Sequence, residues 1–187
     1  ISQAQEFIKF ESQNAEKLKT QEIEYSEKLR QQEIQMQQQL QIKEAEIKTQ
    51  QEEMEREQQR REEITRKMEN ASNLETQADQ LAINERFEES ISKYEEAKKL
   101  LEEVNADGNF GNQMSKIENL NKKIEKSEGY LLKKKAEEDF KNKKWKEAVE
   151  KFTQAKEKLE KSGTKQNEIA EIEKKLKKAE KKANKKW

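Results

Sequence analysis

The chain contains no proline, and only four glycines interrupt its 187 residues. Proline removes a backbone donor and clashes with the preceding helical turn, so a chain without it can form very long helices. Residues 1–70 contain neither glycine nor proline. Charged residues make up 43% of the chain and hydrophobic residues 30%, which suits narrow helix–helix seams better than one large globular core. The sequence therefore predicts an all-α protein of the coiled-coil or helical-repeat class.

Apolar residues recur at a spacing of eleven over residues 1–47. Eleven residues make almost three turns of α-helix, so each series stays on one face, and the repeat predicts a straight or slightly right-handed supercoil. Left in water, such a stripe would promote aggregation. We therefore expect residues 1–70 to form a long helix whose first 47 residues bind a coiled-coil partner. The partner-facing seam is Phe7, Leu18, Tyr25, Leu29, Met36, Leu40 and Ile47, and a further series at the same spacing is Ile23, Ile34 and Ala45.

The stripe almost disappears over residues 48–63, where Met54 is the one remaining large apolar residue before Ile64. Glutamates there precede arginines by four residues, as in Glu52–Arg56 and Glu57–Arg61, and each such pair stabilises a helix by a few tenths of a kcal/mol. This segment is expected to be a helical, solvated spacer.

Residues 87–103, FEESISKYEEAKKLLEE, return 58 residues later as residues 145–161, WKEAVEKFTQAKEKLEK. Each copy is followed by a glycine-containing turn and by a further apolar pattern, which repeats at an offset of 55. The aligned pairs are Ala78 with Ala136, Phe87 with Trp145, Ser90 with Ala148, Tyr94 with Phe152, Ala97 with Ala155, Leu101 with Leu159, and Ile117 with Ile172. The pattern predicts two tandem three-helix units, 71–128 and 129–187, the first starting at an N-cap cluster in residues 70–73.

The repeated residues resemble the tetratricopeptide repeat. In that family a small residue lies early in the first helix, an aromatic residue at the hairpin turn, and Ala, aromatic and Ala along the second helix. The second copy matches well with Ala136, Trp145, Ala148, Phe152 and Ala155, and the first copy matches less closely. The period near 57 and the missing proline depart from the family. A third helix after each hairpin is also similar to the microtubule-interacting and trafficking domain, and the two resemblances stay open.

Catalytic and metal-binding side chains are scarce. The chain has no histidine and no cysteine, and it carries no glycine-rich phosphate loop. Asp107, in Asn-Ala-Asp-Gly, lacks the alternating oxygen ligands of a calcium loop and is expected to lie in a plain turn. Phe87, Tyr94, Trp145 and Phe152 are expected in the hairpin cores rather than in a peptide-binding site. We expect no enzyme activity, cofactor or metal.

Two acids in the first unit bear on the resemblance. Carboxylate-clamp repeats hold a peptide's terminal carboxylate with Lys and Asn on the first helix, and the matching positions here are Glu75 and Asp79. Acids would repel such a ligand, so this function of the family is not expected.

Charge is uneven although the net charge is zero. Residues 121–187 carry 23 lysines against 13 acids, which gives +10, so residues 1–120 sum to −10. The tail contains a basic patch, which is either a solvated helix end or a contact for an acidic polymer such as a tubulin tail. It lacks the apolar face of a membrane-surface helix and the aromatic interleaving of a nucleic-acid module, so neither partner is expected. The patch is Lys174, Lys175, Lys177, Lys178, Lys181 and Lys182.

These features together predict a scaffold. We expect part of a longer chain that mediates protein–protein contacts in the cytoplasm, within a cytoskeletal assembly such as the microtubules of a ciliary axoneme. The alternative is an adaptor of the tetratricopeptide or microtubule-interacting type, which binds peptides of partner proteins in trafficking or chaperone work.

Overall fold

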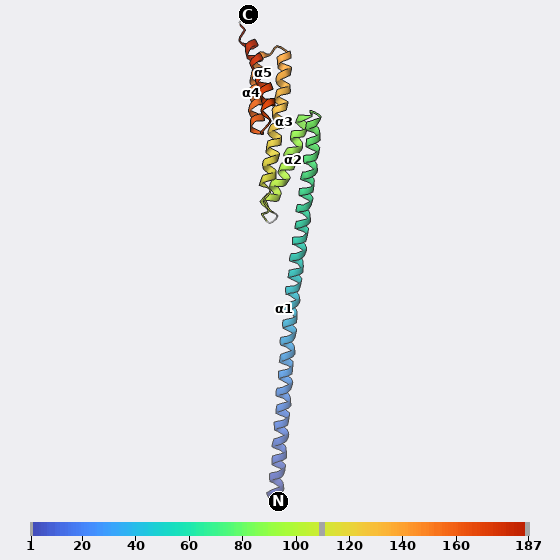
Figure 1. Ribbon diagram of the computed structural model, residues 1–187. Helices are drawn as coiled ribbons and strands as arrows, with labels where there is room; N and C mark the ends of the chain where they lie inside the picture. Colours follow the sequence, from blue (N-terminus) through green and yellow to red (C-terminus); the bar gives the residue numbers. More distant parts are fainter. Residues whose placement is uncertain (1, 109–110, 186–187) are drawn as a thin grey trace. The chain divides into compact units, whose positions relative to one another are not determined.

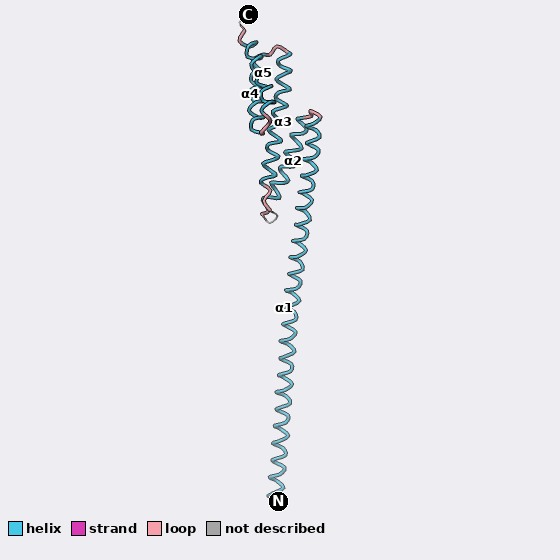
Figure 2. The backbone as a smooth tube through the Cα atoms, viewed as in Figure 1, coloured by secondary structure: helices cyan, strands magenta, loops and turns pink. Residues whose placement is uncertain are grey.

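The computed structural model describes residues 2–108 and 111–185, and within these ranges it contains helices and no strand. Figure 1 colours the chain along the sequence, from blue at the N-terminus to red at the C-terminus, and Figure 2 colours it by secondary structure. The all-α prediction is confirmed. The helices are α1 (Ser2–Ile83), α2 (Phe87–Ala106), α3 (Met114–Lys141), α4 (Trp145–Lys161) and α5 (Gln166–Ala183).

The chain divides into two units, Ile1–Gln59 and Arg60–Trp187. In the first unit, the described residues belong to α1 alone, and every side chain from residue 3 to residue 59 is exposed. The expected long N-terminal helix is therefore present. The predicted spacer is helical and exposed over residues 48–59.

The second unit begins earlier than the sequence predicted. Helix α1 continues through residues 70–73 to Ile83, so no helix starts there. The prediction that these residues form an N-cap is therefore wrong. Asn and Ser are tolerated inside a helix when neighbouring residues gain tertiary contacts, and here Ala71 and Leu74 are buried. Packing starts earlier still, since Ile64 is only 5% exposed and the Arg60 guanidinium donates two hydrogen bonds to Asp107, at 2.6 and 2.8 Å.

Two apolar cores lie in this unit, one in each half. The first half (residues 60–128) packs the end of α1 against α2 and the start of α3. The second half (residues 129–185) packs the end of α3 against α4 and α5. The first core contains Ala71, Leu74, Ala78, Tyr94, Ala97, Leu101, Ile117 and Leu120. The second contains Ala136, Ala148, Phe152, Leu159, Ile169, Ile172 and Ala179.

Helix α3 belongs to both halves. Its 28 residues run without a break, so no loop separates residue 128 from residue 129. In Figure 1 this helix passes from beside α2 to beside α4. Where α4 meets α3, Gly129 is buried, and a Cβ built there would lie 2.6 Å from the Leu159 Cγ. A small residue at this position lets the two helices approach closely.

The two hairpins turn in the same way. Glu85 and Lys143 follow α1 and α3 with φ of 59° and 61°. The Arg86 N–H donates to the Leu81 carbonyl at 2.9 Å, and the Lys144 N–H donates to the Asp139 carbonyl at 2.9 Å. The Glu85 N–H also donates to the Ala82 carbonyl at 3.1 Å, and the Lys143 N–H to the Phe140 carbonyl at 3.2 Å. Together these bonds form the Schellman motif that commonly ends a helix.

Candidate interaction surfaces

The predicted seam on α1 is exposed along its whole length. Exposure of its seven residues ranges from 44% at Leu29 to 68% at Tyr25. Consecutive α-helical residues are separated by about 100°. Members of one eleven-residue series therefore shift by only about 20° per repeat, and the seven residues form one stripe. Ile23 and Ile34, 58% and 47% exposed, lie on another face of the helix.

A ladder of glutamates runs beside the stripe, and the sequence reasoning missed it. Four of its members follow a stripe residue by four positions, which makes them neighbours on the helix surface. The ladder is Glu11, Glu22, Glu33, Glu44 and Glu55, all exposed. Among the described residues, none of the five has an ion-pair partner. The same spacing of eleven that reveals the stripe could have revealed this ladder.

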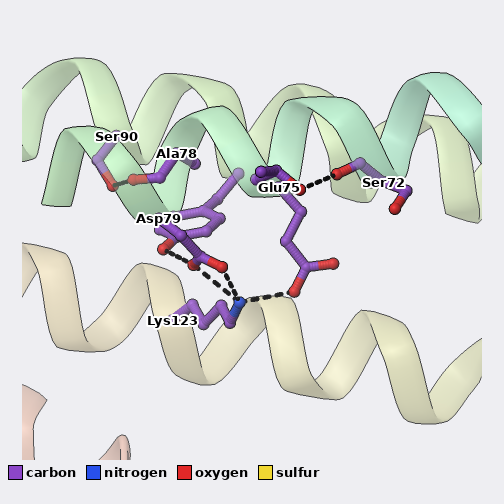
Figure 3. A network of polar contacts seen from close by, with 8 residues as sticks. Ser72, Glu75, Ala78, Asp79, Ser90 and Lys123 are labelled. Carbon is purple, nitrogen blue, oxygen red and sulfur yellow. Dashed lines mark hydrogen bonds and ion pairs between the residues drawn. The ribbon is translucent and has the colours of Figure 1, made fainter. Parts of the chain in front are cut away.

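Lys123 of α3 joins two acids of α1 in the first half (Figure 3). Its Nζ donates hydrogen bonds to a Glu75 oxygen at 2.7 Å and to the two Asp79 oxygens at 2.8 and 2.9 Å. The Tyr94 hydroxyl donates to Asp79 at 2.5 Å, and the buried Ser90 hydroxyl donates to the Ala78 carbonyl at 2.9 Å. Glu75 and Asp79 are therefore engaged within the chain, by a partner that no pattern in the sequence indicates.

Burial and hydrogen bonding perturb two groups of this network. Burial alone would lower the pKa of the Lys123 ammonium, but hydrogen bonds to Asp79 and Glu75 outweigh it and raise that pKa. Burial, followed by the hydrogen bond to Asp79, raises the pKa of Tyr94 well above its ordinary value. Both groups stay protonated at neutral pH, so the network acts as a structural tie between helices.

The second half repeats this tie. Lys175 of α5 donates to Glu137 of α3, which corresponds to Asp79 at the offset of 58. Lys151 of α4 also donates to the largely buried Asp139. In both halves, therefore, a lysine of the third helix is held by an acid of the first. Lys175 belongs to the predicted basic patch, and this contact ties it to the fold.

The four aromatic residues expected in the hairpin cores all pack against other residues of the second unit. Tyr94 and Phe152 are 3% and 1% exposed and belong to the two cores. Phe87 stacks on Tyr130 with ring centroids 5.7 Å apart, and Trp145 meets Phe140 edge-on at 4.9 Å. These contacts support the hairpin-core interpretation. Asp107, the C-cap residue of α2, is the ion-pair partner of Arg60.

Each half carries a groove between its first and third helices. The first-half groove has a volume of about 640 Å³, and its lining includes Asp79, Ala82, Tyr94 and Lys123. The second-half groove, of about 310 Å³, is lined by Glu137, Phe140, Lys141, Phe152, Lys175 and Lys178. At the offset of 58, Asp79, Ala82 and Tyr94 correspond to Glu137, Phe140 and Phe152, so the two grooves are equivalent.

The predicted basic patch is divided by the fold. Lys175 and Lys178 line the second-half groove, and an adjoining hollow of about 280 Å³ is lined by Phe140, Lys178, Lys181, Lys182 and Lys185. Lys174 and Lys177 are exposed but line neither hollow. Phe140, which lies outside the tail sequence, places an aromatic side chain beside these lysines.

No group of His, Cys, Asp and Glu side chains within 2–108 and 111–185 could hold a metal ion. None of the helices in this part of the chain is both long and apolar enough to cross a bilayer. Comparisons with protein-family models, with curated proteins and with solved structures found no match to this chain.

Proposed function

We propose that the chain is a structural protein that uses residues 1–47 of α1 to dock on a partner helix within a larger assembly. The observation that carries this proposal is the contrast between the two units. The second unit buries its apolar residues in two cores, whereas the seven seam residues remain at least 44% exposed. An apolar stripe of this length is costly in water unless another surface covers it.

The size of the seam indicates what kind of assembly it suits. Fully burying a Leu, Ile or Phe side chain contributes about 1.5–3 kcal/mol. The seam residues are already partly covered by their own helix, so about 1 kcal/mol each, or roughly 7 kcal/mol for the seven, is a reasonable gross gain. Association costs about 4–15 kcal/mol in lost freedom. Stable docking therefore needs further contacts in the same complex, as a scaffold in a multi-protein lattice would have.

The glutamate ladder bears on the identity of the partner helix. In an antiparallel pair of two copies, the ladder of one copy would face the ladder of the other, and like charges repel. In a parallel pair the ladder of one copy would face the opposite edge of the other copy's stripe. That edge consists of Phe10, Gln21, Gln32 and Lys43, and Lys43 is its one cation. A different helix, with lysines or arginines beside its apolar stripe, fits the ladder better than a second copy does.

We place this scaffold in the cytoskeleton, with a ciliary axoneme as the specific proposal. The long stripe, the two helical hairpins of tetratricopeptide or microtubule-interacting type, and the absence of His and Cys nucleophiles all favour assembly over catalysis. The predicted contact with acidic tubulin tails belongs to the same proposal, and it would use the basic C-terminal region.

A peptide-binding adaptor is the second candidate. The two equivalent grooves favour it, because each is an open hollow with apolar and charged lining. The two functions make different demands on α1. An adaptor requires no partner for the stripe, and it would be a soluble monomer that binds free peptides.

Stripe variants discriminate between the candidates. We expect Leu18→Gln/Leu29→Gln/Leu40→Gln to abolish incorporation of the tagged chain into the detergent-insoluble cytoskeletal fraction. The matched control, Glu24→Ala/Gln35→Ala/Glu46→Ala, changes three exposed residues at the same spacing on another face and should incorporate normally. Equal incorporation of both variants, or a tagged parent chain that stays soluble, would favour the adaptor.

A further inference from the structure

We propose that the second-half groove and its adjoining hollow bind an acidic peptide segment that inserts one apolar side chain against Phe140. This site lies in the second unit and shares no residue with the seam on α1. It rests on the acidic contact proposed for the basic C-terminal region, and because its test uses no seam variant, it can fail while the docking of α1 holds.

The floor of the site is aromatic and partly open. Phe140 lines both hollows, and its side chain is half-buried. Trp145 packs edge-on against it at 4.9 Å, and Phe152 below is buried in the core. The floor is thus held in place by the second core, and it leaves apolar surface in the hollows. A volume of about 310 Å³ is at the lower end for small-ligand pockets and gives room for one or two side chains.

The rim of the site is strongly cationic. It carries five exposed lysines, Lys141, Lys178, Lys181, Lys182 and Lys185. Among the described residues, none of these five is in an ion pair, whereas the one carboxylate of the lining, Glu137, is bound by Lys175. The rim therefore has an excess of five positive charges and no internal anion to neutralise them. An acidic ligand is the complement of this rim.

The equivalent groove of the first half differs in charge and in its aromatic residues. Ala82 takes the place of Phe140, and the aromatic side chains of that lining come from other positions, Phe87, Tyr94 and Tyr130. Its lining also includes two carboxylates, Asp79 and Glu85, against three lysines, and Asp79 binds Lys123. The repeat thus supplies the same scaffold twice, and the strong excess of positive charge around Phe140 belongs to the second copy.

A peptide fits this combination better than a nucleic acid does. Bases bind to exposed aromatic faces in series along a groove. Here one half-buried ring lies at the bottom of a hollow, and the rim consists of lysines, which attract carboxylates without the bidentate geometry that arginine offers to phosphates and bases.

The test uses the full chain and two synthetic probes. A fluorescein-labelled peptide of six glutamates with a central phenylalanine is titrated against the same peptide with serine at the centre, by fluorescence anisotropy. We expect the phenylalanine peptide to bind roughly tenfold more tightly, since filling an apolar pocket is typically worth that much. In Phe140→Ala, which installs the residue of the equivalent position Ala82, this preference should disappear.

Two lysine variants with the same change in charge complete the design. The groove variant is Lys178→Gln/Lys181→Gln/Lys182→Gln/Lys185→Gln. The control is Lys161→Gln/Lys165→Gln/Lys174→Gln/Lys177→Gln, whose exposed lysines line neither hollow. The groove variant should bind the phenylalanine peptide at least roughly tenfold more weakly, with a smaller loss in the control. Circular dichroism and urea unfolding establish that each variant is folded.

The outcomes separate the alternatives. Selective loss in the groove variant, with a preference for phenylalanine, supports the site. Equal loss in both lysine variants and equal binding of the two peptides would show diffuse attraction to the basic tail and overturn the proposal. Tighter binding of a single-stranded oligonucleotide of equal charge, at the same salt concentration, would overturn it in favour of a nucleic-acid surface.

Discussion

Glu85 and Lys143 lie 58 residues apart and hold the same left-handed backbone conformation, with φ of 59° and 61°. Each ends a helix and closes a Schellman motif in which the next N–H reaches back to the carbonyl five residues earlier. Glycine is the usual residue at this position. The same unfavourable backbone conformation therefore occurs in both hairpins, because the packing of the two helices on either side of each turn determines it.

The strain at Lys143 can be relieved by glycine. A left-handed conformation costs an L-residue about 1–2 kcal/mol, part of which is offset by the flexibility that glycine adds to the unfolded chain. Lys143→Gly should therefore increase the free energy of unfolding by about 0.5–1 kcal/mol in urea titrations. Lys122→Gly, in the exposed interior of α3, is the control and should lower it by about 1 kcal/mol. A loss of stability in Lys143→Gly would show that the turn is not strained.

The close approach of α3 and α4 predicts an unusual response to alanine. Alanine normally stabilises a helix interior by about 1 kcal/mol relative to glycine. In Gly129→Ala the new Cβ would lie 2.6 Å from Leu159 Cγ and 3.3 Å from the Ala155 carbonyl oxygen, so something must move. Overpacking of this kind costs about 1–3 kcal/mol. We expect a net loss of stability in thermal unfolding.

A second substitution tests whether the crowding is the cause. Leu159→Ala alone creates a cavity, because Leu159 is fully buried in the second core. If Leu159 is the residue that is crowded, Gly129→Ala should be less harmful in the Leu159→Ala background than alone. Additive losses in the double variant would contradict this account.

Alkaline pH should weaken the second unit. The pKa of Tyr94 is raised in the folded chain by burial and by its bond to Asp79, and the pKa of Tyr130 is raised by burial and by its bond to Glu168. The pKa of Lys123 is also raised. A group whose pKa is higher in the folded state stabilises the fold fully below its unfolded pKa and loses this contribution as the pH rises. Stability should therefore fall above about pH 10.

Urea unfolding across this pH range provides the measurement. Tyr94→Phe/Tyr130→Phe removes both phenols, so its free energy of unfolding should fall less steeply above about pH 10 than that of the parent chain. A residual slope is expected from Lys123. The same slope in the parent and the double variant would show that these tyrosines do not titrate differently in the folded and unfolded states.

The sequence predicted the elements that depend on local pattern. Helices α2 and α4 start at Phe87 and Trp145, the first residues of the two repeated segments. Three glycines lie in the expected turns with positive φ. Because the two repeated segments can be compared position by position, they indicate a common helical structure even when neither segment is distinctive alone.

The features that sequence reasoning missed depend on contacts between distant residues. Residues 70–73 look like a helix start, but α1 passes through them because Leu74 and Ala78 are buried against α2 and α3. Lys123 is one lysine among many until the fold brings it to Glu75 and Asp79, 48 and 44 residues away. The fold likewise brings Phe140 beside the lysines of the basic tail. Local propensity carries no information about such pairs.

Cysteine labelling tests the docking of α1 most directly, because the chain contains no natural cysteine. Leu29→Cys places a thiol in the stripe, and Gln31→Cys, two residues on, places one on roughly the opposite side of the helix. Both thiols should react quickly with a maleimide in the isolated chain, where both side chains are exposed. In the proposed cytoskeletal assembly, Leu29→Cys should become protected while Gln31→Cys keeps its rate. Equal, rapid labelling of both positions in the assembly would contradict the account.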